Sequence, residues 1–288
     1  MKKKIILVIL IIINLTGISL LLYPAISNFI NTVTNKSTAE SYHNKVNLLS
    51  DDNIDDLLSE AIQYNEFVAK RYYTDESKST YDIYNNYNNI FNFGDGLICY
   101  IEIPKINIYI PVYHDSENND ITLQKGAIHL RQSSLPIGGD NTRSIISAHS
   151  GYPAQKFFDD IDELDNGDSI IIHILNKTIE YEVISSEVIE PQEIENVKVK
   201  ENEDMLTLIT CYPYGINSHR LLVNAVRSNN IKNTTLDTNK KNKADALIKN
   251  DFKATYILIP IIIIVLVILI FRKVKANDRN KSKSTVKK

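Results

Sequence analysis

The chain has 288 residues, with 32 lysines and arginines against 35 aspartates and glutamates, and its formal net charge is −3. That balance gives no sign of a nucleic-acid partner, and the length is that of roughly one or two domains. The two cysteines, Cys99 and Cys211, are too few for a disulfide framework and too far apart in the sequence for a metal site built from paired cysteines.

The charge is unevenly distributed along the chain. Residues 1–4 and 272–288 together hold eleven cations and one anion, a net charge of +10, whereas residues 5–271 hold 21 cations and 34 anions, a net charge of −13. Two basic ends that flank an acidic body are typical of a membrane protein and not of a nucleic-acid-binding protein.

Residues 5–22 and 254–271 form two apolar runs of 18 residues each. As helices they are about 27 Å long, near the lower limit for crossing a bilayer. Because the basic residues lie on the terminal side of each run, we expect a two-pass protein of the cell membrane with cytoplasmic tails at 1–4 and 272–288 and an extracellular body.

A cleaved signal peptide is the alternative interpretation of the first run, since a lysine-rich start followed by an apolar stretch fits one. Residues 23–27 (YPAIS) are a poor cleavage site, which favours a retained anchor. The second run does not fit a cleaved GPI signal, because a long basic segment follows it.

Residues 31–93 are predicted to form a polar helical extension. Acidic residues near 51–56 precede an approximate apolar face, and the helix dipole favours anions at that end. The face consists of Ile54, Leu57, Leu58, Ala61, Ile62 and Val68. This periodicity leaves open whether the extension is a stalk or a cap that packs on the main domain.

From residue 94 onward, short β-type runs alternate with turn residues. This pattern predicts a mainly β fold, a barrel or sandwich of about 130 residues that ends at residue 227. The expected strands are 97–103, 106–110, 143–148, 169–175, 178–188, 205–210 and 221–226. Residues 228–253 are polar and are predicted to tether this domain to the second membrane helix.

Three residues with chemical potential occur where expected strands open into loops. Cys211 ends one strand, and Arg220 enters the next, so that the two are expected on the arms of one hairpin. His149 ends another strand and is followed by a loop with glycine and proline. Such positions are typical of residues at one mouth of a barrel.

The three side chains have complementary chemistry. A thiol with its usual pKa of about 8.5 needs a proton acceptor or a cation nearby to react as a thiolate at neutral pH. An imidazole can transfer the proton, and a guanidinium keeps its charge. Cys211, His149 and Arg220 can therefore act as nucleophile, general acid and base, and oxyanion stabiliser in acyl transfer. Without further context, a lone cysteine is more often a small buried side chain.

The segment 207–211 (TLITC) matches the TLxTC signature of the sortases, the membrane-anchored cysteine transpeptidases of Gram-positive bacteria. The histidine segment 148–151 and the arginine segment 217–223 follow the order of that family. Further similar segments are 94–96, 101–106, 124–127 and 133–139. The chain most resembles class C, the pilin-polymerising sortases, which also carry a helical extension and a C-terminal membrane helix.

The resemblance implies an eight-stranded sortase barrel and a specific reaction. Cys211 would attack the Thr–Gly carbonyl of an LPxTG-like sorting signal to give a thioacyl intermediate, His149 would transfer the protons, and Arg220 would hold the substrate or the oxyanion. The acceptor would be a pilin lysine or, less often, a cell-wall precursor amine. No metal or other cofactor is implied.

Two alternatives remain beside this hypothesis. A housekeeping-type sortase would anchor surface proteins to peptidoglycan, and a catalytically inactive membrane-tethered scaffold would need no intact site. Class C sortases commonly have a lid with an Asp-Pro-aromatic motif, but residues 31–93 contain no proline, so that motif is absent. The filled catalytic positions argue against the inactive scaffold.

Other reactive side chains have weaker contexts. Cys99 lies within an expected strand and is interpreted as a wall thiol, and His219 is expected on the opposite face from Arg220. His114, His129 and His173 have no motif and are interpreted as structural.

Two further chemistries lack their usual signatures. Ser150 is not within a GxSxG elbow, which argues against a serine hydrolase. The acidic runs 159–163 and 201–204 lack the spacing of an EF-hand loop and are interpreted as solvated surface.

Overall fold

The computed structural model describes residues 2–73, 86–116 and 118–228. The predicted second membrane segment (254–271), the C-terminal tail (272–288) and, apart from Ser228, the tether (228–253) lie outside these residues. The described chain divides into two compact units, one ending at Ile30 and the other beginning at Asn31.

The first unit is the N-terminal part of α1 (Lys2–Asn47), a helix that passes through Pro24 without ending. Its large apolar side chains, among them Leu10 and Leu20, are exposed. Within the described residues, this is the one helix that is long and apolar enough to cross a membrane.

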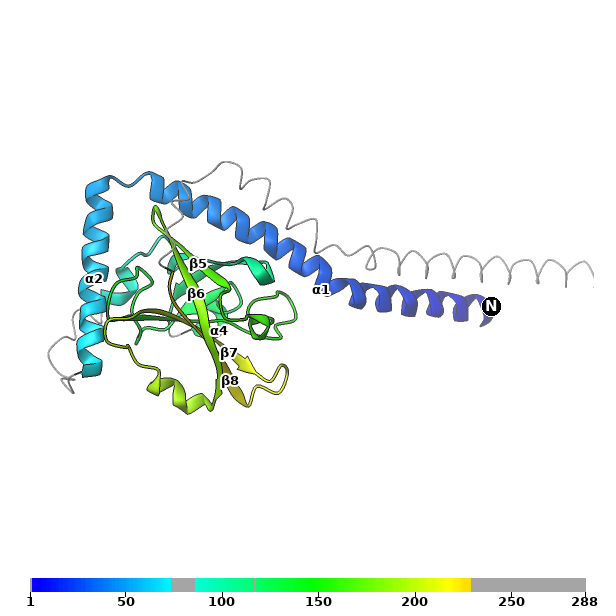
Figure 1. Ribbon diagram of the computed structural model, residues 1–288. Coiled ribbons are helices and arrows are strands. Elements are labelled where there is room, and N and C mark those ends of the chain that lie inside the picture. The colour runs from blue at the N-terminus through cyan, green and yellow to red at the C-terminus, as the bar shows by residue number, and fades with distance from the viewer. Residues whose placement is uncertain (1, 74–85, 117, 229–288) are drawn as a thin grey trace, which may run out of the picture. The chain divides into compact units, whose positions relative to one another are not determined.

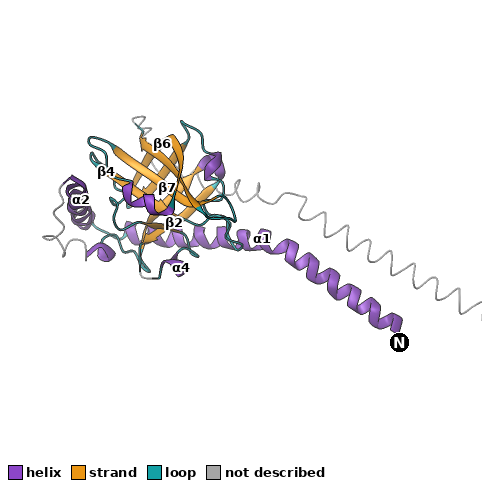
Figure 2. Ribbon diagram, turned by 90° about the horizontal axis from the view of Figure 1, so that it is seen from below, coloured by secondary structure: helices purple, strands orange, loops and turns teal. Residues whose placement is uncertain are grey.

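The second unit is built on a closed β-barrel (Figures 1 and 2). Its strands are hydrogen-bonded in the order β1-β2-β3-β4-β7-β8-β6-β5. Their bounds are β1 Leu97–Ile103, β2 Ile108–His114, β3 Ala127–His129, β4 Thr142–Ser147, β5 Ser169–Ile174, β6 Lys177–Ile189, β7 Asp204–Tyr212 and β8 His219–Arg227. The predicted mainly β fold and eight-stranded barrel are confirmed.

Short helical segments lie in the connections between strands. They are η1 Asn86–Asn89, η2 Pro104–Ile106, α4 Asn119–Thr122, η3 Ile161–Glu163 and η4 Pro191–Asn196. Of these, α4 lies between β2 and β3, and η4 lies between β6 and β7.

The sequence pattern missed β3 and placed β2 too early. β3 has only three residues, too few to show alternation, and it pairs in parallel with β2 and antiparallel with β4. β2 continues through Pro111, which lies opposite Tyr100 although it has no N–H to donate. A proline inside an apolar run resembles a strand end in the sequence, because such residues usually occur at edges or bulges.

In the second unit, the C-terminal part of α1 packs against the barrel. Its buried side chains are spaced as on one helical face: Asn35, Ala39, Tyr42 and Val46. The Tyr42 hydroxyl accepts a hydrogen bond from the backbone N–H of Leu175 (2.8 Å). This part of the extension is therefore part of the folded domain and not a free stalk.

The second helix of the extension, α2 (Asp51–Tyr73), also packs on the barrel (Figure 1). Ile54, Ala61 and Val68 are buried as expected, whereas Ile62 is 49% exposed. The pattern missed two buried polar side chains, Tyr64 and Asn65. Both residues bond to the connection between β3 and β4.

Each of the two buried polar residues bonds to backbone groups of the β3–β4 connection. The Tyr64 hydroxyl donates to the carbonyl of Arg131. The Asn65 side chain pairs with Leu135 in both directions, donating to its carbonyl (3.1 Å) and accepting from its N–H (2.7 Å). Buried amide pairs of this kind fix one orientation because an unmade bond in the interior costs free energy.

Candidate active site

Cys211 and Arg220 lie opposite each other in the β7–β8 hairpin, one residue from the loop that joins the strands. The predicted placement on two arms of one hairpin is confirmed. The Arg220 guanidinium donates from Nη1 to the carbonyl oxygens of His219 (2.9 Å) and Asn217 (3.2 Å). These bonds hold the guanidinium at the end of the hairpin where Cys211 lies.

His149 reaches the same end of the barrel from β4. This strand runs parallel to β7, and Ser147 pairs with Ile209 at its end. Two further bonds extend the contact beyond the strand: the Ala148 N–H donates to the Ile209 carbonyl (3.2 Å), and the Thr210 hydroxyl donates to the Ala148 carbonyl (2.8 Å). By this register, His149 and Cys211 occupy neighbouring positions on adjacent strands.

The structure thus brings the three predicted residues, Cys211, His149 and Arg220, to one end of three adjacent strands. The order β4-β7-β8 in the barrel accounts for this, since residues 62 positions apart in sequence become neighbours through parallel pairing. Sequence spacing alone contains no information about that pairing.

The loop after His149 is attached to the cysteine strand by Ser150. Its hydroxyl donates to the carbonyl oxygen of Cys211 (2.7 Å). The next residue, Gly151, has a φ of +76°, and a Cβ added there would lie 3.3 Å from the ring of Tyr214 in the β7–β8 loop. The loops that follow His149 and Cys211 therefore lie close together, and the positive φ favours glycine where they meet.

The imidazole of His149 lies among aromatic rings. The Tyr152 ring is nearly parallel to it, with centroids 5.5 Å apart, and the Phe157 ring is tilted at 6.5 Å. Burial lowers the pKa of His149, and the carboxylates of Asp120 and Asp159 act in the opposite direction. A lowered pKa leaves more of the imidazole neutral, which is the form that accepts a proton.

An apolar strip continues along the barrel face that carries Cys211 and Arg220. Ile209 and Leu222 lie two residues from them on the same strand faces, opposite each other, and are buried together with Ile145 of β4. Four partly buried side chains from neighbouring segments complete this cluster: Leu130, Ile189, Ile194 and Val197. Ile194 belongs to η4, so the β6–β7 connection packs against the strip.

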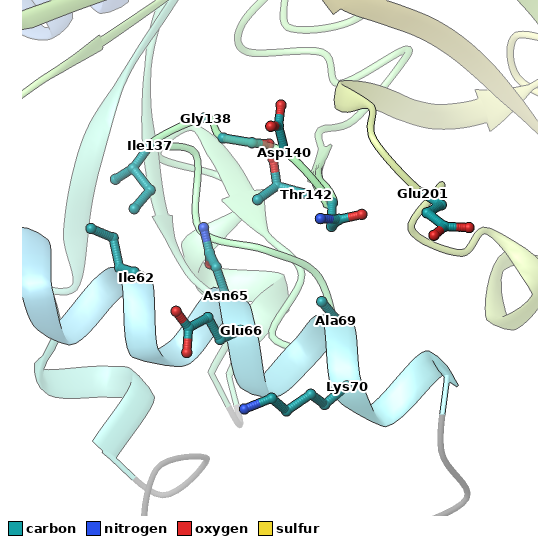
Figure 3. A pocket seen from close by; sticks show the side chains of 12 residues that line it. Ile62, Asn65, Glu66, Ala69, Lys70, Ile137, Gly138, Asp140, Thr142 and Glu201 are labelled. Carbon is teal, nitrogen blue, oxygen red and sulfur yellow. Dashed lines mark hydrogen bonds between the residues drawn. The ribbon is translucent and has the colours of Figure 1, made fainter.

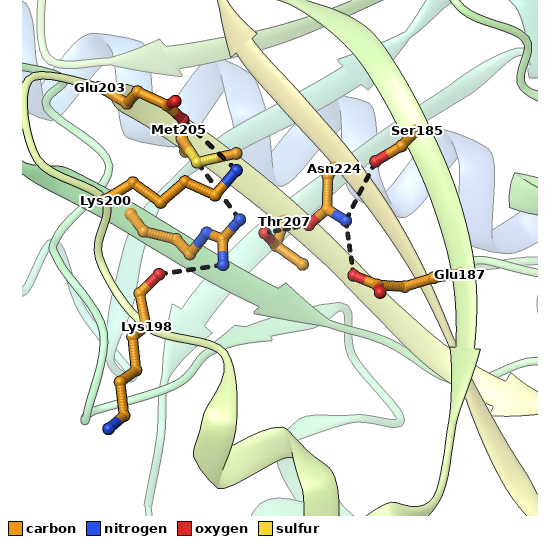
Figure 4. Close-up of polar contacts among 9 residues, drawn as sticks. Ser185, Glu187, Lys198, Lys200, Glu203, Met205, Thr207 and Asn224 are labelled. Atoms are coloured by element: carbon orange, nitrogen blue, oxygen red, sulfur yellow. Dashed lines mark hydrogen bonds and ion pairs between the residues drawn. The ribbon is translucent and has the colours of Figure 1, made fainter.

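Farther along the same face, the apolar strip gives way to polar contacts (Figure 4). The Thr207 hydroxyl donates to the Asn224 side-chain oxygen (2.9 Å), and the Asn224 amide donates to Glu187 (2.9 Å) and more weakly to Ser185 (3.4 Å). These bonds link β7, β8 and β6 by side chains. Thr207, the first residue of the TLITC segment, therefore has a structural contact that explains its presence without any part in chemistry.

A cavity of about 490 Å³ lies elsewhere, between α2 and the 137–142 turn (Figure 3). Glu66 and Lys70 line it from the helix, and Thr142 and Glu201 line it from the barrel side. Thr142 is the first residue of β4, whereas His149 follows the last one. The cavity is therefore at the opposite end of the strands from Cys211.

The other candidates from the sequence are placed as follows. Cys99 is fully buried in β1, and burial raises the pKa of its thiol well above the ordinary value, which fits the wall-thiol interpretation. His219 is exposed and bonds to the neighbouring Ser218 hydroxyl (2.8 Å). His173 contacts the Glu102 carboxylate (2.7 Å) on the β1–β5 side of the barrel.

Two buried histidines surround Tyr87 of η1. The Tyr87 hydroxyl lies 2.9 Å from His129 Nδ1, and its ring is edge-on to His114 at 4.7 Å. Burial lowers the pKa of His129 to about 3 and also lowers that of His114. Within residues 2–73, 86–116 and 118–228, no group of three histidine, cysteine, aspartate or glutamate side chains is arranged to hold a metal ion.

The acidic run 159–163 is not simply a solvated surface. Asp159 accepts hydrogen bonds from the N–H groups of Gly151 and Phe157, both at 2.9 Å, and Asp160 pairs with Lys156. Sequence reasoning missed this contribution of Asp159 to the loop after His149.

Comparison with known proteins agrees with this geometry. Residues 101–228 match the family model described as the sortase domain. Sortase C of Clostridium perfringens, solved with the C-terminal cell wall sorting motif, is 40% identical to this chain with a TM-score of 0.58, and the match covers 67% of this chain and 98% of that one. Sortase C1 of Streptococcus agalactiae is 36% identical with a TM-score of 0.59, covering 66% of this chain and 96% of that one.

Among curated proteins, sortase D of Bacillus subtilis (strain 168) is 26% identical over 114 residues. That match covers 40% of this chain and 54% of sortase D, so the chain spans about half the length of this relative.

Proposed function

The chain belongs to the sortase family of cysteine transpeptidases, with class C sortases as structural neighbours, and we propose that Cys211, His149 and Arg220 carry out its reaction. The observation that supports this assignment most is the strand register. It makes Cys211 a direct neighbour of Arg220 across the hairpin and of His149 across the β4–β7 pair.

In the first half of the proposed reaction, the Cys211 sulfur, as thiolate, attacks the carbonyl carbon between Thr and Gly of an LPxTG-like sorting signal. The tetrahedral intermediate carries its negative charge on the former carbonyl oxygen, which the Arg220 guanidinium stabilises. When the C–N bond breaks, protonated His149 gives its proton to the leaving glycine amine. The product is a thioester between Cys211 and the threonine acyl group.

In the second half of the proposed reaction, an amine and not a water molecule attacks the thioester. Neutral His149 removes a proton from the incoming amine, whose nitrogen attacks the thioester carbon and expels the Cys211 thiolate. The new bond is an amide, and the enzyme returns to its starting state. We propose a pilin lysine as the acceptor, which makes the overall reaction the joining of pilin subunits.

The apolar strip beside Cys211 supports an LPxTG-like donor. Ile209 and Leu222 are themselves buried, and the apolar area that remains open to a ligand is that of the partly buried side chains packed over them: Leu130, Ile189, Ile194 and Val197. A leucine and a proline side chain lose contact with water when bound along such a surface, at about 25 cal/mol for each Å² of apolar area. The neighbouring sortase C of C. perfringens was solved with a cell wall sorting motif.

We further propose that residues 5–22 of α1 are retained as a membrane anchor, that residues 228–253 tether the barrel to a second membrane helix at 254–271, and that both basic tails are cytoplasmic. The charge distribution of the sequence supports this topology, because the basic clusters lie at the two ends. The barrel is then extracellular, on the side where sorting signals and acceptor amines are found.

The test is mass spectrometry of the full chain incubated with a sorting-signal peptide and no amine. We expect a mass increase equal to the threonyl fragment on Cys211, and its release as an amide when a lysine peptide is added. A chain that joins peptide and amine at the wild-type rate after Cys211→Ala would contradict the proposal.

A housekeeping-type sortase that attaches surface proteins to peptidoglycan is the second candidate. The absence of a proline, and hence of the Asp-Pro-aromatic lid motif, in residues 31–93 favours it over a class C enzyme. Comparison of a pilin lysine peptide with a peptidoglycan stem peptide as acceptor for the same thioester discriminates the two. A preference for the stem peptide would support the second candidate.

A further inference from the structure

We propose that Asp159 is a positioning residue for His149: it closes the loop that follows the histidine and so holds the imidazole at the end of β4. The inference rests on the proposed role of His149 in the sortase reaction. Asp159 itself bonds to the loop backbone and has no direct part in bond making.

Both oxygens of the Asp159 carboxylate accept backbone N–H groups of this loop, one from its far end and one from its near end. Oδ1 accepts the N–H of Gly151 (2.9 Å), and Oδ2 accepts the N–H of Phe157 (2.9 Å). A third bond, from the N–H of Phe158 to the carbonyl oxygen of His149 (2.9 Å), joins the two ends of the same loop. The loop from 149 to 158 is thus closed by two bonds across its base, one of which needs Asp159, and the bond from the Phe157 N–H orients the carboxylate for it.

The closed loop carries the aromatic rings that flank the imidazole. Tyr152, whose ring lies parallel to that of His149, lies between the two residues that Asp159 binds, and Phe157 is one of them. Phe157 and Phe158 are fully buried, so the closing end of the loop is fixed in the core. Asp159 therefore links the buried end of the loop, at Phe157 and Phe158, to Gly151, which lies two residues after His149.

A second attachment holds the middle of the loop. The Asn31 side-chain amide donates to the carbonyl oxygen of Ala154 (2.7 Å). This bond fixes the loop from α1 but does not bring its two ends together, so it cannot replace the closure by Asp159.

The carboxylate also acts through its charge. Two carboxylates, Asp159 in the loop and Asp120 on α4, raise the pKa of His149 against the effect of burial. Asp120 is exposed and is not part of the loop, so it contributes its charge without closing the loop. The chain therefore contains a matched control: Asp120→Asn removes a similar charge and leaves the closure in place.

Asp159→Asn keeps the size of the side chain, but its amide nitrogen cannot accept an N–H, so one of the two bonds to the loop backbone is lost. In the full chain, we expect kcat for peptide-to-amine transfer to fall about 10-fold, because a small displacement of a catalytic group is costly. KM for the sorting peptide should stay within about twofold, since the apolar strip is unchanged. For Asp120→Asn, kcat at the pH optimum should change by less than about twofold.

Both substitutions should move the pH at which His149 loses its proton to lower values, because each removes a negative charge that favours the imidazolium. Only Asp159→Asn should also speed hydrogen exchange at one of the two amides that the carboxylate binds, those of Gly151 and Phe157. Hydrogen exchange and a histidine titration by NMR are measured in a Cys211→Ala background, so they test the role of Asp159 even if the proposed function fails.

Two results would overturn the proposal. One is unchanged exchange at both amides together with unchanged kcat in Asp159→Asn. The other is identical behaviour of Asp159→Asn and Asp120→Asn, which would reduce the role to charge.

If Asp159→Asn does not fold, Asp159→Ser is measured instead; its hydroxyl keeps one acceptor, and we expect faster exchange at one amide. Protection of both amides in that variant would equally overturn the proposal.

Discussion

Cys211 of β7 and Arg220 of β8 lie directly opposite each other. The Arg220 guanidinium is held in place by the backbone carbonyl oxygens of Asn217, in the β7–β8 loop, and of His219, the first residue of β8. The cation is thereby fixed at the end of the hairpin where Cys211 lies, and the partners in these two bonds are neutral carbonyl groups. Its charge remains available for an anion that forms during reaction, as oxyanion stabilisation requires.

The first prediction concerns the fork geometry of Arg220. Arg220→Lys keeps the positive charge but loses the planar guanidinium, so we expect kcat/KM to fall by about 100-fold with little change in folding. The measurement is steady-state transfer of a sorting peptide to an amine.

Arg227, at the other end of β8, is the matched control for that substitution. It lies near Asp204, with Nη1 3.9 Å from Oδ2, and far along the strand from Cys211. Arg227→Lys should leave kcat/KM within about twofold. An equal loss in both variants would show that the effect of Arg220→Lys comes from the strand and not from the reacting groups.

The second prediction separates the two thiols by reactivity. A thiol-specific reagent should modify Cys211, which is partly exposed, and leave Cys99, which is fully buried with a raised pKa, unmodified in the folded chain. Mass spectrometry should find one label before unfolding and two after it. Labelling of Cys99 at a similar rate in the folded protein would contradict the burial of β1.

Sequence reasoning identified the parts of the barrel whose patterns are local. β1 was predicted with its observed bounds, and β4 to β8 within a few residues, because apolar runs bounded by turn residues define them. β3 was missed because it has only three residues, Ala127–His129. They form a strand through their pairing with β2 and β4 and not through a pattern of their own. Long-range pairing leaves no periodic trace in so short a segment.

The residues of the candidate site also divide into those that have a signal in the local sequence and those that have none. Cys211, His149 and Arg220 could be selected from residue type, from strand ends and from family resemblance. Asp159 could not be assigned, because its contacts are with backbone N–H groups of a loop whose shape no pattern encodes. The contacts of Tyr64 and Asn65 were overlooked for a related reason. Both residues lie at helical spacing from Ala61 and Val68, but their partners are backbone groups of the β3–β4 connection, which no local pattern identifies.

The third prediction is that folding stability falls in acid because of the histidines around Tyr87. Burial holds the pKa of His129 at about 3 in the folded chain, against about 6.5 when unfolded. Between these values the unfolded chain binds more protons, so the free energy of unfolding rises with pH from about 3 to about 6.5. Urea unfolding at a series of pH values should show the denaturation midpoint falling as pH is lowered through this window.

His129→Gln tests the assignment of that pH dependence. Removing the titrating group should flatten the curve below pH about 6.5, although the variant starts from a lower stability because its bonds to Tyr87 and to the Ser134 carbonyl (2.8 Å) are disturbed. His219→Gln, at an exposed position, is the control and should leave the curve unchanged. A curve for His129→Gln that runs parallel to that of the wild type would refute the assignment.

The last prediction concerns the contact between the two loops of the candidate site. Gly151→Ala places a methyl group 3.3 Å from the Tyr214 ring at a φ of +76°, and both effects push the loop after His149 away from the cysteine strand. Gly167→Ala is the matched control, because its φ is +94° but an added Cβ meets no atom within 4 Å. Each variant should lose about 1 kcal/mol of stability from the backbone strain, measured by urea unfolding.

Only Gly151→Ala should also lose transfer activity, by about 10-fold, because the loop that it displaces carries His149. Tyr214 is 67% exposed, so its side chain can be shortened at little cost, and adding Tyr214→Ala to Gly151→Ala should restore part of the activity while the stability stays low. Activity and stability should respond differently because they have different causes. Shortening the tyrosine removes the steric contact that lowers activity, but it leaves the strained φ that lowers stability. Equal activity losses in Gly151→Ala and Gly167→Ala, or no recovery in the double variant, would mean that the contact with Tyr214 does not set the position of the loop.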